Sequence, residues 1–306
     1  MSEASHAQPT GPSARTPAGN IYDLGYRSYD GARLGRRYAF MSLFSYSMLS
    51  IWGIGRSWLA KLFPWGLAII ALVPAVIILA VAALVPAEFE VARPEEYYGF
   101  VSIVLALICA VAAPDLIGRD QRHHTLALYF SRALDRLDYA GAKLGALVLS
   151  LFLVLSLPQV FLQIGNAVAT DDLTQYLQDN IDIIPPVLAT SALAAVFMAS
   201  LSLAISIHTS RRAFATGAVI AAFVILAALG TIFVNTLDGD AQKYSLLVSP
   251  FGILEGVVFW IFGAEPLSGS EIEEAGLSGG YYLIAILIYT AVFLGVLYRR
   301  ITRMSV

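Results

Sequence analysis

The sequence predicts an all-α integral membrane protein with six membrane-spanning helices. Three observations predict this class: the composition, the length of the uncharged stretches, and the placement of the basic residues. Of the 306 residues, 58% are hydrophobic and only 13% are charged, whereas soluble domains usually carry about 25% charged residues. Because the deficit comes from long stretches without any charge, it indicates segments that lie in lipid.

Six stretches are long enough to cross a bilayer. A helix needs about 20 apolar residues to cross the hydrocarbon core. The uncharged stretches between successive charged residues contain 26, 18, 27, 28, 25 and 24 residues. We therefore expect a single transmembrane domain over 38–300, with spans at about 64–86, 97–118, 142–166, 184–208, 213–235 and 279–298.

The basic residues gather on one side of these spans. If the N-terminus is cytoplasmic, 17 of the 19 Lys and Arg residues lie on the cytoplasmic side, and 15 of the 22 Asp and Glu residues lie on the other side. Positive residues mark the cytoplasmic side of a membrane protein. We therefore expect both termini in the cytoplasm, with a tail over 1–37 that is disordered at its start and a short tail over 301–306.

One further apolar segment is not predicted to span the membrane. It contains Pro250, Gly252 and a central Glu255. A charge at the bilayer centre costs about 3 kcal/mol, and Pro and Gly interrupt a helix. We therefore expect a re-entrant or interfacial hairpin over about 246–264 that packs against protein.

An amphipathic stretch precedes the first span. Phe40, Phe44, Met48 and Trp52 recur at intervals of four, so they share one helix face. This pattern predicts a helix over 38–60 that lies in the membrane interface. A short helix packed within a cytoplasmic domain is the alternative.

The loop between the second and third spans reads PDLIGRDQRHHTLALYFSRALDRLDYAGAK. Its centre, over about 121–130, can form two or three helical turns, and Asp135 and Asp138 have the spacing of a capping box before the third span. We expect a short helix that projects into the cytoplasm. Such a helix can receive force from a soluble partner.

The order of these parts resembles the permease subunits of bacterial ATP-binding cassette transporters of the type 2 exporter family. Those subunits have an interfacial elbow helix, six spans, a cytoplasmic coupling helix between spans two and three, and a re-entrant hairpin before span six. The residues that match the family's recurring pattern in the loop are Thr125, Leu126, Ser131, Arg132, Leu134, Arg136, Tyr139, Gly141 and Lys143. The loop departs from the family at His124 and Ala133, where Gly and Pro are usual, and a second similarity is Ser249-Pro250-Phe251.

The resemblance implies a protein that works in the inner membrane of a bacterium, most often in export. It implies a separate cytoplasmic ATPase subunit that holds ATP and Mg²⁺, a second permease chain in a homo- or heterodimer, and contact with membrane lipid. The net charge of −3 gives no basic excess for nucleic acid. The residues expected to couple to the ATPase are Arg119, Arg122, His123, His124, Thr125, Leu126, Leu128, Tyr129, Phe130, Arg132 and Arg136, with the leucines and aromatics as apolar anchors.

No pattern on the chain predicts catalysis or a cofactor. The sequence has no G-x-x-x-x-G-K-[ST] phosphate loop, so ATP hydrolysis is expected on a partner. The G-x-S-x-G match at 276–280 places Ser278 on the opposite predicted side from all four histidines, which leaves it without a base. The adjacent His123 and His124 would point about 100° apart on a helix and so chelate one ion poorly. Cys109 is the one cysteine, which excludes a disulfide within the chain.

Polar residues in the third span offer one clue to a pathway. Gln159, Gln163 and Asn166 share a helix face, and they either line a substrate path or make interhelical hydrogen bonds. An ATP-independent secondary transporter or channel is the alternative function, and it predicts internal repeats or charged residues at mid-membrane. A polytopic membrane enzyme is the third, and it predicts clustered His, Asp or Glu on one side of the bilayer.

Overall fold

The computed structural model describes residues 31, 34–82, 93–123, 125–131, 134–169, 178 and 180–303. Within these residues the chain forms helices joined by turns, with no β-strand. The described helices belong to one compact unit, Leu34–Val306. Six of them are long and apolar enough to cross a membrane. The predicted all-α class is confirmed for the described residues, and the six long helices agree with the six predicted spans. A bent pair of helices before the last long helix would make a seventh if it were counted as one span. The chain is a multi-pass membrane protein.

Each of the six long helices lies where a span was predicted. They are α2 (Trp58–Ala82), α3 (Glu96–Arg122), α5 (Arg136–Ala169), α7 (Ile184–Ser206), α8 (Arg212–Thr236) and α12 (Gly279–Thr302). Several of these helices extend beyond the predicted spans: α2 begins before 64, α3 continues past 118, α5 begins before 142, and α12 continues past 298. Helix α3 continues because its charged residues Asp115 and Asp120 pair with cations of neighbouring segments. The predicted end of the first span, near 86, lies outside the described residues.

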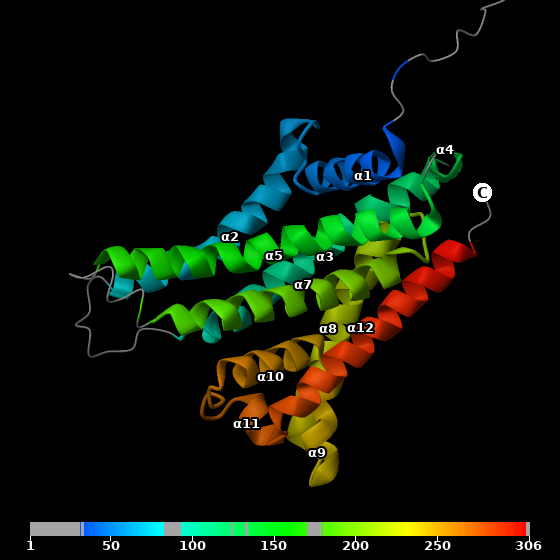
Figure 1. Cartoon of the computed structure of the whole chain (residues 1–306). Helices are drawn as coiled ribbons and strands as arrows, with labels where there is room; N and C mark the ends of the chain where they lie inside the picture. Colours follow the sequence, from blue (N-terminus) through cyan, green and yellow to red (C-terminus); the bar gives the residue numbers. More distant parts are fainter. Residues whose placement is uncertain are drawn as a thin grey trace, which may run out of the picture. The chain divides into compact units, whose positions relative to one another are not determined.

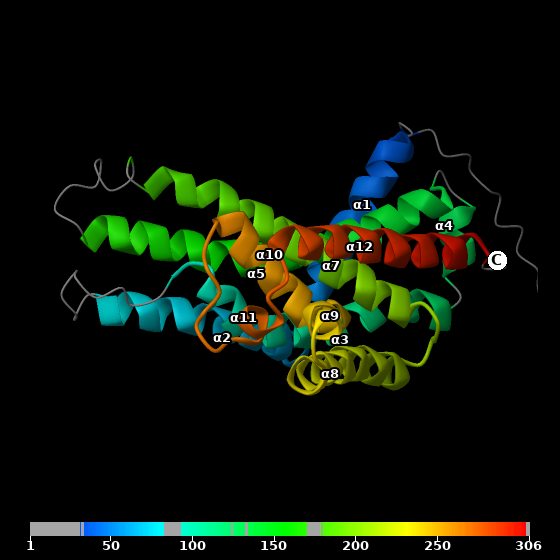
Figure 2. The same cartoon turned by 90° about the horizontal axis from the view of Figure 1, so that it is seen from below.

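Helices α3 and α7 form the centre of the bundle. In each of them, 67% of an apolar stretch of 18 residues is buried inside the protein. The corresponding share is 17% in α2 and α12 and 22% in α8. Helices α3, α5 and α7 run side by side, and α8 and α12 cross them on one side (Figures 1 and 2). The peripheral helices α2, α8 and α12 therefore leave most of their apolar residues free for lipid or another chain.

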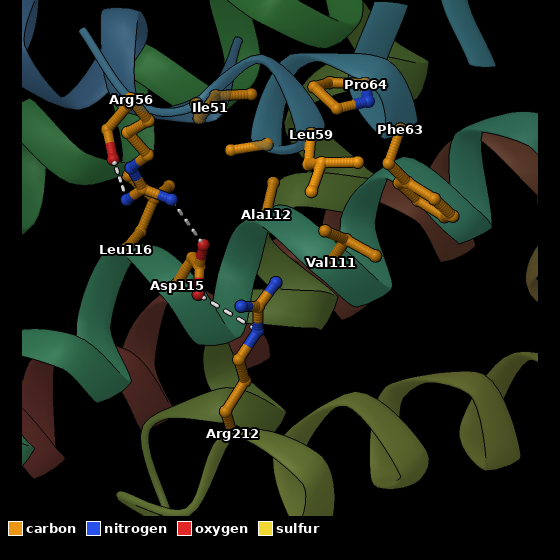
Figure 3. Close-up of a pocket in the computed structure, with 12 residues that line it drawn as sticks. Ile51, Arg56, Leu59, Phe63, Pro64, Val111, Ala112, Asp115, Leu116 and Arg212 are labelled. Carbon is orange, nitrogen blue, oxygen red and sulfur yellow. Dashed lines mark hydrogen bonds and ion pairs between the residues drawn. The ribbon is translucent and has the colours of Figure 1, made fainter. Parts of the chain in front are cut away.

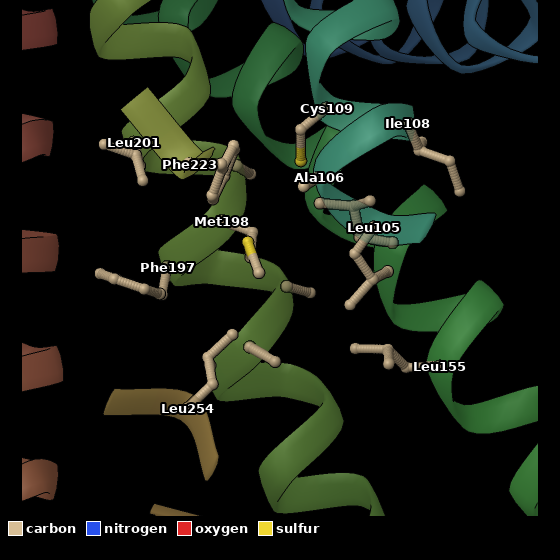
Figure 4. Packing of buried hydrophobic residues seen from close by; sticks show 14 of the residues in the cluster. Leu105, Ala106, Ile108, Cys109, Leu155, Phe197, Met198, Leu201, Phe223 and Leu254 are labelled. Carbon is tan, nitrogen blue, oxygen red and sulfur yellow. The ribbon is translucent and has the colours of Figure 1, made fainter. Parts of the chain in front are cut away.

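Close packing of aliphatic and aromatic side chains holds the centre together (Figure 4). Leu105 of α3, Leu155 of α5, and Phe197 and Met198 of α7 are all buried in one continuous cluster. Cys109 is fully buried in the same cluster, which confirms that it is a small core residue. Burial of this kind stabilises a membrane protein mainly through van der Waals contact, because lipid is as apolar as the core.

Helix α1 (Gly35–Ile51) corresponds to the predicted interfacial helix, but the predicted bounds of 38–60 were wrong. The helix ends at Ile51, and a turn leads into α2 at Trp58. Gly53 and Gly55 have φ values of 65° and 83° in this turn, a conformation that glycine adopts without strain. A side chain at Gly53 would also lie 2.6 Å from the carbonyl oxygen of Ala60. The two glycines therefore end α1 early.

The predicted apolar face of α1 packs on α5 rather than facing away from the protein. The rings of Phe40 and Phe44 lie against Gly141 and Gly145. A Cβ added to either glycine would lie 3.7 or 3.3 Å, respectively, from the ring. The small residues let the two helices approach closely. The side of α1 that is free of the protein carries other large apolar residues, namely Tyr38, Met41, Tyr46 and Leu49.

A broken helical segment precedes α12. Helix α9 (Asp240–Tyr244) and the 3₁₀ turn η2 (Ser245–Val248) meet α10 (Pro250–Phe262) at 105°. The local sequence explains the break: the Ser249 hydroxyl accepts a hydrogen bond from the Gly252 N–H at 3.1 Å, and Pro250 begins the new helix. The segment starts at Asp240, before the predicted 246. Helix α10 packs on α7, α8 and α12, and α11 (Glu271–Ala275) leads to α12.

The packing of α10 on α12 gives a test of the fold. The Cβ of an alanine at Gly256 would lie 2.5 Å from the ring of Tyr282, which is fully buried. Overpacking of this kind costs about 1–3 kcal/mol. We expect Gly256→Ala to lower the midpoint of thermal unfolding in detergent. Gly280→Ala, with no atom within 4 Å of the new Cβ, is the control, and equal midpoints for the two variants would contradict the contact.

Candidate functional site

One end of the bundle gathers the segments on which the predicted coupling residues lie. It contains the short helix α4 (Leu126–Phe130), the start of α5, and the ends of α3, α7 and α12, and we call it the α4 end (Figure 1). The side-chain amide of Gln121 donates to the carbonyl of Ile207 at 3.2 Å, and the Arg136 guanidinium donates to the carbonyl of Thr302. These bonds join α3 to the α7–α8 turn and α5 to α12.

Helix α4 is anchored on its inner face. The rings of Tyr129 and Phe130 lie 5.7 and 5.9 Å from the ring of Tyr139 in α5, within the range of favourable aromatic contacts. A small apolar cluster surrounds these rings, formed by Leu43, Leu126, Leu134 and Ala142. On the outer face, Leu128 is 66% exposed. Of the four predicted apolar anchors, Leu128 alone points away from the chain.

The short helix was predicted over 121–130, but it is shorter than that. Gln121 and Arg122 belong to α3, and α4 begins only at Leu126. Both the N–H and the hydroxyl of Thr125 donate to the carbonyl of Asp120, at 3.1 and 3.3 Å. This six-to-one hydrogen bond is the usual way of closing a helix end, and it separates α3 from α4.

A buried ion pair joins α3 to α5 behind α4. The Lys143 ammonium lies 2.8 Å from the Asp120 carboxylate, and the two side chains are only 4% and 7% exposed. The Tyr139 hydroxyl donates to the same carboxylate at 2.8 Å. Because a buried charge without a partner is costly, this pair sets how α5 sits on α3. The rings of Tyr129 and Phe130 in α4 pack on Tyr139. The position of α4 therefore depends on both long helices.

Tyr129 contributes no charge to this end of the protein. Burial raises the pKa of its hydroxyl to about 12, and the negative charge of Asp120 acts in the same direction. The phenol is therefore protonated and neutral at physiological pH. The Tyr129 hydroxyl therefore brings no charge to the contact between α4 and α5.

Helix α1 is held to the start of α5 by ion pairs. Arg36 donates to Asp138 at 2.6 Å and lies 2.9 Å from Asp135. The Asp138 carboxylate also accepts the N–H of Asp135 at 3.2 Å, which is the contact expected from the capping-box spacing. Exposed pairs of this kind add little stability, so their main effect is to orient α1.

The basic residues predicted to couple to the ATPase are only partly free to meet a partner. Arg122 and His123 are exposed at the end of α3. Arg119 lies 3.6 Å from Asp115 within the same helix, and Arg136 covers the ring of Phe130 at 5.7 Å. Two further predicted residues, His124 and Arg132, lie outside the described part of the chain.

A second polar cluster lies at this end, and it was not predicted from the sequence. Asp115 of α3 lies 3.0 Å from Arg56 in the α1–α2 turn and 3.1 Å from Arg212 at the start of α8 (Figure 3). With Arg119 these residues form what we call the arginine cluster. Asp115 served in the sequence only as the boundary of an uncharged stretch, and no local pattern links it to arginines so far away in the chain.

The polar face of the third span is partly explained by a hydrogen bond to the turn before α3. Gln159 is 1% exposed, and its amide donates to the carbonyl of Pro94 at 2.7 Å. Gln163 and Asn166 are half-buried further along α5. A group of hydroxyls between α3 and α7, where Tyr98 lies 3.0 Å from Ser191, was not found from the sequence, because each residue is unremarkable alone in an apolar run.

Comparison with known proteins assigns no family. No protein-family model matches the chain, and no curated protein sequence matches it. Among the residues that the structure describes, no group of three or more His, Cys, Asp or Glu side chains is placed to hold a metal ion. The function is therefore argued from the contacts at the α4 end.

The buried ion pair leads to a stability prediction. Lys143→Met leaves Asp120 buried without a cation, and we expect it to lower the free energy of unfolding by about 3–5 kcal/mol. The measurement is thermal unfolding in detergent. Lys243→Met, which removes an exposed pair with Asp240 (3.1 Å, with 52% and 88% exposure), is the control and should change stability by less than about 1 kcal/mol. Similar losses in both variants would show that the pair does not hold α3 to α5.

Proposed function

We propose that the chain is the permease subunit of an ATP-binding cassette transporter of the type 2 exporter-like family. It would form the substrate pathway and be driven by a separate cytoplasmic ATPase that holds ATP and Mg²⁺. The observation that carries the proposal is helix α4, a short helix between two candidate spans with a packed inner face and an exposed Leu128 on its outer face. A coupling helix needs both properties, because it must bind a partner and must move the spans with it.

The contacts behind α4 support a path for force. Tyr129 and Phe130 pack on Tyr139, and Tyr139 bonds to the Asp120–Lys143 pair between α3 and α5. Helix α3 in turn packs on α7 at the centre of the bundle. A push on α4 would therefore turn α3 and α5 together rather than deform a loop.

In this proposal, ATP binding closes the ATPase dimer and brings the α4 helices of two permease chains together. The spans then shift between inward-open and outward-open packings, which are two states of one bistable element. The apolar surfaces of α2, α8 and α12 supply area for a second permease chain and for lipid. This chain itself would contribute no covalent chemistry and no cofactor.

The remaining parts also have roles in this proposal. Helix α1 is the interfacial elbow, since Tyr38, Met41, Tyr46 and Leu49 leave one side apolar and free. The bent pair that meets at Ser249 is a re-entrant hairpin, which returns to the side from which it entered. Both termini are cytoplasmic in a bacterial inner membrane, as the basic residues indicate.

The test of the function is a pull-down of the tagged full chain from native membranes in mild detergent. We expect an ATPase subunit with a phosphate loop to co-purify and to hydrolyse ATP in the complex. Leu128→Asp should reduce the amount of that subunit at least about tenfold, because it places a charge at the centre of the contact.

Leu267→Asp is the matched control, since Leu267 is also exposed (44%) but lies in the loop between α10 and α11. It should leave the yield of the ATPase unchanged. If no ATPase co-purifies in several detergents, the proposal fails, and a secondary transporter or channel becomes the better account. If Leu128→Asp keeps the ATPase, α4 is not its docking helix.

The proposed orientation is tested by cysteine labelling in intact cells. Cys109 is buried, so the native background should react little. A membrane-impermeant maleimide should label Leu267→Cys from outside, and Leu128→Cys only after the membrane is permeabilised. The reverse pattern would place the α4 end outside the cell.

A further inference from the structure

A cavity of about 400 Å³ opens beside the arginine cluster, between the α1–α2 turn, α3 and the start of α8 (Figure 3). Its walls are of two kinds. Arg56, Asp115 and Arg212 form a charged wall, whereas the first turns of α2 and the facing turn of α3 form an apolar wall. The apolar wall includes Leu59, Phe63, Pro64 and Val111.

The arginine cluster, in which Arg119 lies outside the cavity lining, has an excess of positive charge. One carboxylate, that of Asp115, faces three guanidinium groups at 3.0, 3.1 and 3.6 Å, so the cluster carries a net charge of +2. Arg56 also donates to the Ser50 hydroxyl at 2.8 Å. Arg212 faces Asp115 through its Nε, its side chain is 50% exposed, and its terminal nitrogens make no hydrogen bond to the described residues. An anion with several oxygens would satisfy these donors.

The apolar wall belongs to the end of a candidate span. Leu59 and Phe63 are 63% and 47% exposed on α2, and Trp58 beside them is 69% exposed. Aromatic residues at the end of a membrane helix lie at the level of the lipid headgroups. The cavity therefore opens where the phosphates of a bilayer meet the acyl chains.

We infer that this cavity binds an anionic phospholipid, whose phosphate lies against Arg56 and Arg212 and whose acyl chain lies against Leu59 and Phe63. Guanidinium groups match phosphate oxygens in geometry and charge. A free phosphate ion would use the charged wall alone and leave the apolar wall in water. A zwitterionic lipid would bring its own cation to an already positive site. The inference does not depend on an ATPase partner.

The experiment titrates the purified full chain in detergent with phosphatidylglycerol and, separately, with phosphatidylcholine of the same acyl chains. Native mass spectrometry counts the bound lipid. We expect the natural protein to prefer phosphatidylglycerol, and Arg212→Gln to weaken that binding about tenfold. Arg300→Gln is the control, because it removes the same charge from an exposed position on α12 and should leave the preference unchanged.

A second variant and a competitor complete the test. Leu59→Asp changes the exposed mouth of the cavity and should also weaken phosphatidylglycerol binding, which keeps the test decisive if Arg212→Gln does not fold. Equal binding of the two lipids, or equal phosphatidylglycerol binding by Arg212→Gln and Arg300→Gln, would overturn the inference. Displacement of the lipid by millimolar inorganic phosphate would also overturn it, since the site would then recognise an anion alone.

Discussion

The pairing of Lys143 with Asp120 is the interaction on which the α4 end depends. The two charged groups are buried and lie 2.8 Å apart. Neither helix can therefore shift without exposing or separating them. Tyr139 binds the same carboxylate and supports the aromatic residues of α4. One ion pair thus determines both how two central helices meet and where a short helix outside them is held.

The six long apolar helices and their order could be predicted from the sequence, because a helix needs about 20 apolar residues to cross a bilayer. The ends of these helices could not. Asp115 and Asp120 continue α3 because distant cations pair with them, and pairing across the fold leaves no local pattern. The end of α1 was missed for a different reason: Gly53 and Gly55 take positive φ values that their identity permits but does not require.

The candidate site was predicted in outline and not in detail. Spacing placed a short helix before the third span, but it could not show that Tyr129 and Phe130 face inward while Leu128 faces outward. Five residues make too few turns for a readable periodicity. The arginine cluster was invisible because Arg56 and Arg212 come from segments far apart in the chain and meet only through Asp115.

The glycine contacts between α1 and α5 have a mechanical consequence. Phe40 and Phe44 occupy sites at Gly141 and Gly145, which are one helical turn apart, and leucines follow at the next turn on either side, at 137 and 149. Sliding α1 by one turn would drive a phenylalanine ring into a leucine. Helix α1 therefore has a single register on α5. The two helices form one rigid unit, so any rotation of α5 also moves α1.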